Sequence, residues 1–351
     1  MKIWLLTTEY PPFFGGGIAT YSYHTAKMLV EKGDEVVVFV ADEKVECDVQ
    51  IERRENIEIC RFKPKGKEIY VHLGYYAALS YDYAERVIER IKQVGAPDII
   101  EVQDYLGLAY YLLHRKYELD SLLTRLPVVI TVHSPMFVCD EIDMNPRHIQ
   151  ENFWIYEMER FCIGAADFVI FPSKHVCKKI QKKMDVPLRS YAIVPHPYMP
   201  NMQAEDSLGQ DWIYVGRVQY LKGLDHLLSY LSCLWEKGLG KPLKIYGSDS
   251  FFYHKNTFFQ NYLIKKYNRL YERGFFTFCG LIPPNELLSA MRLAEIVFIP
   301  SLFESFSYVA IESLALGKVV IASDSGGQGE IIQDRKNGYL FSHKSPESFN
   351  R

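Results

Sequence analysis

The sequence predicts an α/β protein of two domains, each built on a doubly wound parallel sheet, facing each other across a cleft. Short apolar runs alternate with amphipathic helical patterns along the whole chain, which is typical of parallel strands covered by helices on both faces. The chain also has 351 residues, more than one hydrophobic core usually organises. Alternation and length together therefore favour two lobes of similar architecture.

The first domain is expected over residues 1–198. Its opening apolar run, 3–6, leads through Pro11-Pro12 and three glycines into a helical pattern that stops at Gly33. Further buried strands are expected at 36–40, 98–102, 128–132 and 168–171, and a helix is expected at 83–94. A proline-rich segment at 194–198 and the polar stretch after it predict a domain boundary near residue 198.

The second domain is expected over residues 199–351, where the same alternation starts again. Strands are predicted at 212–215, 243–246, 275–278, 296–299 and 319–322, and helices at 225–235 and 286–294. The chain ends soon after Ser345-Pro346-Glu347, a pattern typical of the start of a helix. We therefore expect that a C-terminal helix is cut short and that the chain is a fragment of a longer protein.

Composition argues against several classes of protein. A net charge of -3, with 48% hydrophobic and 24% charged residues, gives no general attraction to nucleic acid. The seven cysteines are scattered and form no C-x-x-C pair, so neither a zinc site nor a redox site is expected. No apolar run approaches the roughly 20 residues of a membrane span, and the N-terminus does not resemble a signal peptide. A cytoplasmic location is expected.

Three glycines, Gly15, Gly16 and Gly17, stand between the first predicted strand and the first predicted helix. Glycine lets the backbone approach a ligand closely, and a helix N-terminus offers free N–H groups to an anion. The motif is not a full G-x-G-x-x-G, so an ordinary strand-to-helix turn is the alternative. Asp42 follows the second strand, where an NAD dehydrogenase has its ribose-binding acid, so a dehydrogenase is also considered.

In the second half, Gly216-Arg217 follows a predicted strand and Lys222 comes just before a predicted helix. A guanidinium and an ammonium at one strand end can neutralise a leaving diphosphate through charge-assisted hydrogen bonds. The sequence has no D-x-D triplet, so no metal site is expected. No cofactor is expected beyond the substrate itself. The alternative is that both cations are ordinary surface residues.

Two glutamates, Glu304 and Glu312, are separated by eight positions that run from a loop into a helix. Because Glu304 is expected in the loop and Glu312 in the helix, both can face one ligand. Between them, the amides of Phe306, Ser307 and Tyr308 are expected at the helix N-terminus, where they can hold an anion. Glu312 lies among apolar residues, where an unpaired carboxylate is costly. The alternative is a helix cap and a surface ion pair.

In their order along the chain these motifs resemble those of the retaining glycosyltransferase family four, which has the GT-B fold of two Rossmann-like domains. The resemblance covers nearly the whole chain and includes the motifs Gly15 to Gly17, Gly216-Arg217, Lys222-Gly223, Phe278-Cys279-Gly280, the Glu304 and Glu312 pair, and Ser325-Gly326-Gly327 with Glu330. The chain departs from the family at Ser307, where glycine is usual, and at His196-Pro197, where Asn-Gly is usual.

The resemblance implies a role for each of these residues. Arg217 and Lys222 bind the diphosphate of the donor, Glu304 contacts its sugar, and Glu312 binds its ribose. The backbone beside Leu281 holds the base, and the glycine loop of the first domain closes over the phosphates. These roles assign the donor to the second domain and the acceptor to the first.

The resemblance also singles out His133, after a first-domain strand, as a catalytic residue near the sugar or the acceptor. The implied reaction is metal-independent transfer of a hexose-type sugar, with retention, from a UDP- or GDP-sugar to a hydroxyl. Acceptors considered are a glycan, a lipid-linked sugar or a small molecule, bound by first-domain loops such as 62–76 and 134–148. The alternative is a catalytically weak module that binds a nucleotide sugar within a larger protein.

Two further patches have open interpretations. Four lysines recur at helical spacing beside Val176 and Ile180: Lys178, Lys179, Lys182 and Lys183. This is the pattern of a helix that lies on a membrane surface, although a solvated face is the common alternative. Residues 251–275 are rich in aromatic side chains, which predicts either a helix core or a surface for carbohydrate or protein.

Overall fold

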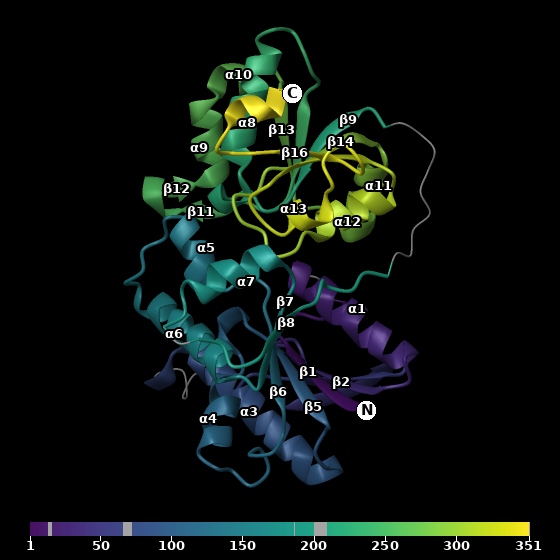
Figure 1. The fold of residues 1–351 in the computed structure, drawn as a ribbon, viewed down its shortest axis with the longest axis vertical. Coiled ribbons are helices and arrows are strands. Elements are labelled where there is room, and N and C mark those ends of the chain that lie inside the picture. Colours follow the sequence, from purple (N-terminus) through teal and green to yellow (C-terminus); the bar gives the residue numbers. More distant parts are fainter. Residues whose placement is uncertain (13–15, 66–71, 186, 200–208, 351) are drawn as a thin grey trace. The chain divides into compact units, whose positions relative to one another are not determined.

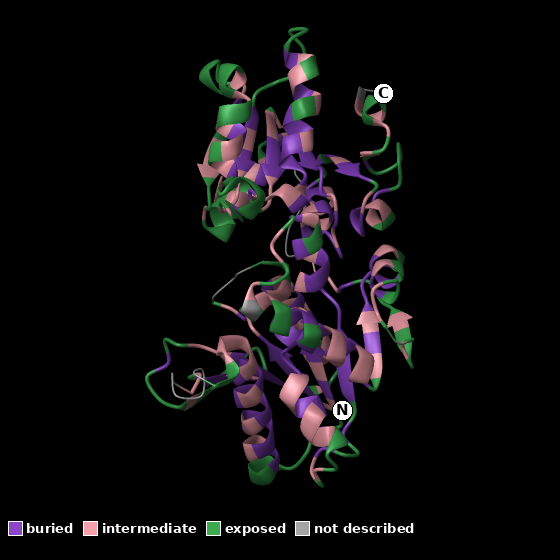
Figure 2. Ribbon diagram, turned by 90° about the vertical axis from the view of Figure 1, so that its left-hand side faces the viewer, coloured by how far each residue is buried: buried purple, intermediate pink, exposed green. Residues whose placement is uncertain are grey.

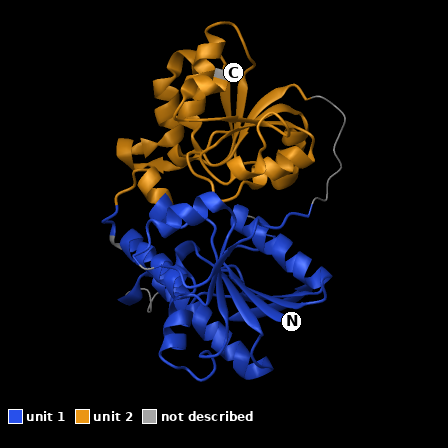
Figure 3. Cartoon of the chain, in the orientation of Figure 1, with its two compact units in different colours: residues 1–138, 147–199 blue, residues 139–146, 200–351 orange. Residues whose placement is uncertain are grey.

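The computed structural model describes residues 1–12, 16–65, 72–185, 187–199 and 209–350. The chain divides into two compact units, each with its own sheet (Figures 1 and 3): residues 1–138 with 147–199, and residues 139–146 with 200–351. The sequence analysis assigns 139–146 to the first domain, and the structure corrects this. The segment belongs to the second unit because Asp143 accepts hydrogen bonds from Gln219 and from the amide of Leu221.

Unit 1 is built on an eight-stranded sheet in the order β3-β4-β2-β1-β5-β6-β7-β8. Its strands are β1 (Lys2–Thr7), β2 (Glu35–Ala41), β3 (Val49–Arg54), β4 (Ile57–Phe62), β5 (Ile99–Gln103), β6 (Val128–Thr131), β7 (Phe168–Phe171) and β8 (Tyr191–Ile193). Every neighbouring pair is parallel except β3 with β4 at one edge. The doubly wound prediction is confirmed for this unit.

The helices of this half are α1 (Gly17–Glu31), α3 (Tyr75–Val94), α4 (Tyr110–Tyr117), α5 (Met136–Ile142), α6 (Gln150–Ala165) and α7 (Lys174–Gln181). The steps from β1 to β2 and from β5 to β6 run in opposite directions across the sheet, so right-handed crossovers place α1 and α4 on opposite faces. The strands between them are buried on both sides (Figure 2). On one face Leu5 packs with Val38, and on the other Trp4 lies 5.1 Å from Phe39.

Unit 2 has a six-stranded sheet in the order β13-β10-β9-β14-β15-β16. Its strands are β9 (Asp211–Val215), β10 (Leu243–Tyr246), β13 (Phe276–Gly280), β14 (Ala294–Ile299), β15 (Val319–Ser323) and β16 (Tyr339–Phe341). All neighbours are parallel. Read in chain order this is 3-2-1-4-5-6, the arrangement of a dinucleotide-binding α/β fold. A separate hairpin joins β11 (Phe251–Phe252) to β12 (Thr257–Phe258).

Helices cover both faces of the second sheet: α8 (Leu224–Trp235), α9 (Phe259–Lys266), α10 (Asn268–Glu272), α11 (Pro284–Arg292), α12 (Tyr308–Ala315) and α13 (Gln328–Ile331). Successive strand residues point to opposite faces, so Tyr214 joins the core under α8 while Ile213 joins the core under α12. The same alternation separates Phe298 from Val297. Among the described helices, none is long and apolar enough to cross a lipid bilayer.

Candidate functional site

The strand order of unit 2 reverses between β9 and β14, which are neighbours in the sheet but far apart in the sequence. In open α/β sheets, ligands bind outside the carboxyl ends of the strands at such a switch point. Gly216 and Arg217 follow the carboxyl end of β9, and Glu304 follows that of β14. The topology therefore brings the predicted cations and the first predicted glutamate to one edge of the sheet.

Lys222 and Glu304 meet directly at this edge. The Nζ atom of Lys222 lies 2.7 Å from Oε2 of Glu304, and the Ser301 hydroxyl donates to the same oxygen at 3.2 Å. Only 20% of the Lys222 side chain and 15% of the Glu304 side chain are exposed, so the pair is weakly screened. Arg217 is exposed, and within the described ranges it has no ion-pair partner. A fixed cation and a solvated one thus lie in the same loop region.

Glycines shape the loop that carries these cations. Gly223 has φ +72°, and a Cβ at this position would lie 1.8 Å from the carbonyl oxygen of Pro300. Gly247, after β10, has φ +146°, and a Cβ there would lie 2.0 Å from the carbonyl oxygen of Gly216. Both positions combine a backbone that side chains avoid with a contact that leaves no room for one. The loops after β9, β10 and β14 are therefore packed backbone against backbone.

The loop after β15 packs in the same way against the segment that holds Glu304. The amide of Gly327 donates to the carbonyl of Glu304 at 2.7 Å, and a Cβ on Gly327 would lie 2.1 Å from the carbonyl oxygen of Ser305. A Cβ on Gly326 would lie 2.6 Å from the amide nitrogen of Glu304. The Ser325-Gly326-Gly327 motif therefore supports the Glu304 backbone, which its sequence alone does not reveal.

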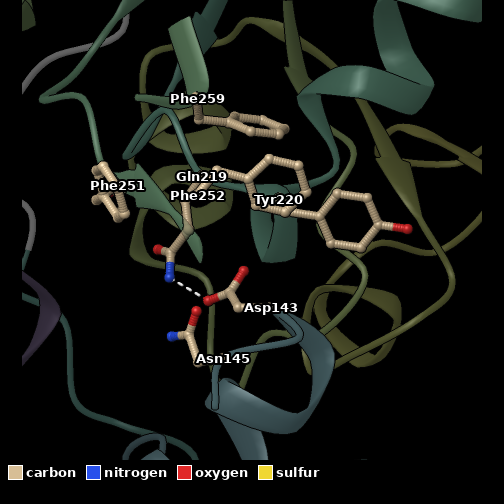
Figure 4. A pocket seen from close by; sticks show the side chains of 8 residues that line it. Asp143, Asn145, Gln219, Tyr220, Phe251, Phe252 and Phe259 are labelled. Carbon is tan, nitrogen blue, oxygen red and sulfur yellow. Dashed lines mark hydrogen bonds between the residues drawn. The ribbon is translucent and has the colours of Figure 1, made fainter. Parts of the chain in front are cut away.

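Asp143 is a residue of this region that the sequence analysis missed. It accepts the amide of Leu221 at 2.7 Å and the side-chain amide of Gln219 (Figure 4), and thereby fixes the turn η2 (Tyr220–Lys222) that ends at Lys222. Burial raises the pKa of the Asp143 carboxyl to about 6. A small cavity of about 20 Å³, room for about one water molecule, lies between Asp143 and the ring of Phe252.

Glu312 lies on α12, in the core-facing surroundings that its sequence predicts. Its side chain stays partly exposed, and burial by the surrounding protein raises the pKa of its carboxyl to about 7. Ser307 begins the helix: its hydroxyl accepts the amide of Ala310 at 3.2 Å. Phe306 and Tyr308 are buried on either side, with ring centroids 5.4 Å apart. Part of the predicted helix N-terminus is therefore capped by the chain itself.

Leu281 directly follows β13, and 79% of its surface is open to solvent. The preceding residue, Gly280, accepts the amide of Gly247 at 2.9 Å, which joins the ends of β13 and β10. An apolar side chain so exposed beside the loops of the switch point is consistent with the predicted place for a base.

Of the three glycines in the first half, Gly15 lies outside the described residues. Gly16 precedes α1 and Gly17 is its first residue, and both are exposed. The carbonyl of Gly16 accepts both the amide and the hydroxyl of Thr20, at 3.2 Å each, and no side chain caps the helix. Gly16 and Gly17 thus occupy the predicted strand-to-helix position at the carboxyl end of β1, beside the switch point of unit 1.

His133 follows β6 and is buried in a cluster of aromatic rings in unit 1. Its ring centroid lies 4.7 Å from that of Tyr21 and 4.8 Å from that of His196, and Tyr21 and His196 are 4.5 Å apart. Burial lowers the pKa of His133 to about 3, so the ring is neutral near pH 7. Its Nε2 atom is buried, and no described residue hydrogen-bonds to it. The neighbours Tyr21 and His196 were not among the predicted site residues.

Two buried acids hold the loops around His133. The Asp104 carboxylate accepts the amide of His133 at 2.8 Å, and burial raises its pKa to about 7. Glu159 accepts the amides of Leu106 and Met136, at 3.1 and 3.0 Å, and burial also raises its pKa. Glu159 stands among apolar neighbours on α6, and this sequence signal could have identified it as a buried, bonded carboxylate.

Asp42, on which the dehydrogenase alternative rested, has partners within unit 1. Its Oδ2 lies 3.7 Å from the guanidinium of Arg61, and its Oδ1 accepts the amide of Lys44 at 2.9 Å. Arg61 is itself buried and also contacts Glu52 at 2.9 Å. Asp42 thus closes a turn and neutralises a buried arginine, which accounts for its presence at the end of β2.

The lysine-rich segment forms α7, with Val176 and Ile180 fully buried against unit 1. Those two apolar side chains are therefore not available to enter a bilayer. Lys178 and Lys182 are exposed, while Lys179 and Lys183 are partly buried. Membrane contact stays a prediction that could rest only on charge.

The aromatic segment 251–275 contributes both to the core and to the surface. Phe252 and Phe259 are in the core, while 51% of Phe258 is exposed.

Comparison with known proteins identifies the class. Residues 15–199 match the family described as Glycosyltransferase Family 4, and residues 204–351 match the one described as Glycosyl transferases group 1. An uncharacterised glycosyltransferase of Methanocaldococcus jannaschii is 26% identical, over 99% of this chain and 87% of that protein. The protein is thus a glycosyltransferase with the GT-B fold. Because the first match spans more than half of its residues, the chain belongs to Glycosyltransferase Family 4.

Solved structures agree with this fold. Sucrose-phosphate synthase from Thermosynechococcus elongatus superposes with a TM-score of 0.72 at 19% identity, over 99% of this chain and 87% of that one. The Anabaena protein HepE, in complex with UDP and glucose, gives a TM-score of 0.64 at 16% identity, over 99% and 88%. At these identities the likeness establishes the two-domain architecture.

Proposed function

We propose that this glycosyltransferase transfers a hexose-type sugar, with retention and without a metal, from a nucleoside-diphosphate sugar to an acceptor hydroxyl. The observation that supports this most strongly is the Lys222–Glu304 pair at the switch point between β9 and β14. A cation and a sugar-binding carboxylate are needed side by side where the diphosphate joins the sugar. HepE, a structural neighbour with UDP and glucose bound, supports the class of donor.

In this proposal the chain's own groups neutralise the leaving diphosphate. Lys222 and Arg217 donate charge-assisted hydrogen bonds to it, and the dipole of α12, whose N-terminus follows the Glu304 loop, adds a smaller contribution. Asp143 holds Lys222 in place through the turn η2. Because Glu304 and the turn η2 hold Lys222, this donor needs little reorganisation as charge develops, which is the main source of electrostatic catalysis.

His133 has a different proposed role. With a pKa near 3 its ring is neutral at neutral pH, so it carries no positive charge and acts only by donating or accepting hydrogen bonds. Its unpartnered Nε2 can serve a hydroxyl of the sugar or the acceptor. Asp104 positions it by accepting its backbone amide. We assign no protein nucleophile: a diphosphate oxygen takes the proton of the acceptor hydroxyl, whose oxygen bonds to the anomeric carbon as the bond to diphosphate breaks on the same face.

Binding of the donor is tested by thermal unfolding with UDP, GDP or ADP, each in the presence of EDTA. A ligand at 100 times its Kd stabilises by about 2.7 kcal/mol, which shifts the midpoint by several degrees. We expect one nucleoside diphosphate to stabilise strongly without metal. Absence of any shift would contradict the proposal.

Two variants separate binding from turnover. Lys222→Met should weaken nucleoside diphosphate binding about 10- to 100-fold, because it removes a hydrogen bond to a charged group. Glu304→Gln should retain this binding but lower sugar transfer at least about 100-fold. Isothermal titration and a donor-consumption assay give the two readouts. Full binding in both variants with no turnover in the unmodified protein would favour the alternative, a catalytically weak binding module.

A further inference from the structure

A cavity of about 270 Å³ lies in unit 1, and part of its lining belongs to the segment 62–76, which the sequence analysis assigns to the acceptor. One wall comes from the start of α3, with Tyr75 and Tyr76, and the other from α6. The α6 wall consists of Glu151, Trp154, Ile155 and Met158, whose spacing places them on one face of the helix. The cavity thus lies between one face of α6 and the continuous segment 72–77, which leads into α3.

The side chains of the cavity walls differ in how far they are exposed to solvent. Ile155 and Met158 are buried, with 1% and 2% exposure, whereas 53% of Trp154 is open to solvent. Trp4 and Trp235, by contrast, are 0% and 2% exposed. Large aromatic side chains that stay exposed beside a cavity supply contact area for ligands. The exposed Trp154 therefore has the properties of a binding platform.

The polar groups of the rim indicate the class of ligand. Glu151 is an exposed carboxylate. Burial, and after it the charge of Glu151, raises the pKa of the Tyr76 hydroxyl, so the two groups lie near each other. The described lining holds no lysine or arginine; its polar side chains are those of Glu151, His72, Tyr75 and Tyr76, so it offers no cluster of cations to an anion. A ligand with an apolar face for the aromatic rings and several hydroxyl donors for Glu151 matches both features. Sugar rings have this character.

We propose that this cavity binds a sugar ring of the acceptor, stacked on Trp154 with its hydroxyls donating to Glu151. The proposal rests on the glycosyl transfer proposed above. The volume corresponds to about nine water molecules at the density of the liquid, which is enough for one ring. The segments leading to both walls leave the sheet at the carboxyl ends of β4 and β6, the edge from which His133 also emerges.

Binding of neutral oligosaccharides to the full chain tests the proposal. The probes are maltotriose, cellotriose and mannotriose, up to about 10 mM, a range that detects millimolar Kd values, measured by saturation-transfer NMR. We expect at least one to bind, Trp154→Ala to weaken it at least about tenfold, and Glu151→Gln to weaken it by a smaller factor. Phe153→Ala is the matched control, because Phe153 is 49% exposed on the same helix but does not line the cavity.

Three results would overturn the proposal: no binding of any probe, equal binding by the Trp154 variant, or binding of tetramethylammonium in place of the sugars, since an aromatic site with a carboxylate also suits a cation. Thermal stabilisation by the nucleoside diphosphate, measured on the same samples, separates this proposal from the donor site. If that stabilisation persists while sugar binding fails, only the cavity assignment is wrong. If the nucleoside diphosphate does not stabilise the unmodified protein, the proposed function itself is wrong.

Discussion

Glu312 combines a partly open side chain with a pKa raised to about 7 by burial. Below that pH it is mostly protonated in the free protein, and above it the carboxylate can accept two hydroxyl hydrogen bonds. A ribose that donates to the carboxylate favours the ionised form, so binding must displace the proton at low pH. If Glu312 holds the ribose of the donor, as the family resemblance implies, nucleotide affinity is linked to the protonation of this one residue.

We predict that the affinity for the stabilising nucleoside diphosphate falls about tenfold between pH 8 and pH 6, one unit below the Glu312 pKa. Glu312→Gln should bind more weakly at pH 8 and lose this component of the pH dependence. Isothermal titration of both proteins gives the answer, because their difference cancels the titration of the ligand phosphate and of Asp143, whose pKa is about 6. The same pH profile in both proteins would show that Glu312 does not contact the ligand.

At the scale of single residues, the sequence indicated the charged candidate residues but not the residues that hold them in place. Lys222, Glu304 and Glu312 stand out because charged side chains occur where strands end or where a helix is apolar. Asp143 does not, since its partners Gln219 and Leu221 lie 76 and 78 positions away, and Leu221 is engaged only by its backbone amide. Contacts between residues so far apart leave no local pattern in the sequence.

At the scale of elements, Gly223 joins η2 to α8 and offers a direct test of the loop. Gly223 and Gly238 have nearly the same backbone, φ +72° and +73°, but only Gly223 has a neighbour, the Pro300 carbonyl, in the place of a Cβ. Gly238→Ala should cost about 1 to 2 kcal/mol, the strain of the left-handed backbone alone.

Gly223→Ala should cost about 1 to 3 kcal/mol more, because the loop has to move away from Pro300. Since Lys222 is the preceding residue, the variant should also weaken nucleoside diphosphate binding, while Gly238→Ala should not. Urea unfolding and titration of the two variants measure both effects. Equal stability and equal binding would mean that the loop relaxes freely and does not hold Lys222.

The strands that were predicted are those buried on both faces, such as β2 and β9, because continuous apolar runs record that burial. Both β3 and β4 were missed. β3 is an edge strand whose residues are exposed or partly exposed, so burial leaves no pattern in it. β4 is mostly buried, but Glu58 and Arg61 interrupt its apolar run. Helix α3 was predicted from residue 83 but begins at Tyr75. Its N-cap residue, Gly74, has no side chain to accept a hydrogen bond from the helix, and its first turn has no acidic residue.

At the scale of the whole molecule, each unit has its own sheet and its own buried core, so the two need not unfold together. We predict two transitions in calorimetry, with the nucleoside diphosphate raising the one that belongs to unit 2. Gly223→Ala should lower the same transition. Trp4→Ala should lower the other, because Trp4 is fully buried in unit 1. A single transition that responds equally to both variants would contradict independent cores.

The division of the chain at 139–146 also decides how its halves can be recombined. A chimera that exchanges everything after residue 199 replaces the loop from Gly216 to Gly223 but keeps Asp143 from the original parent. The carboxylate that holds Leu221 would then face a foreign turn. Modular exchange within this family should therefore move residues 139–146 together with the second half, as two separate grafts, so that the loop from Gly216 to Gly223 keeps the Asp143 carboxylate that accepts the amide of Leu221.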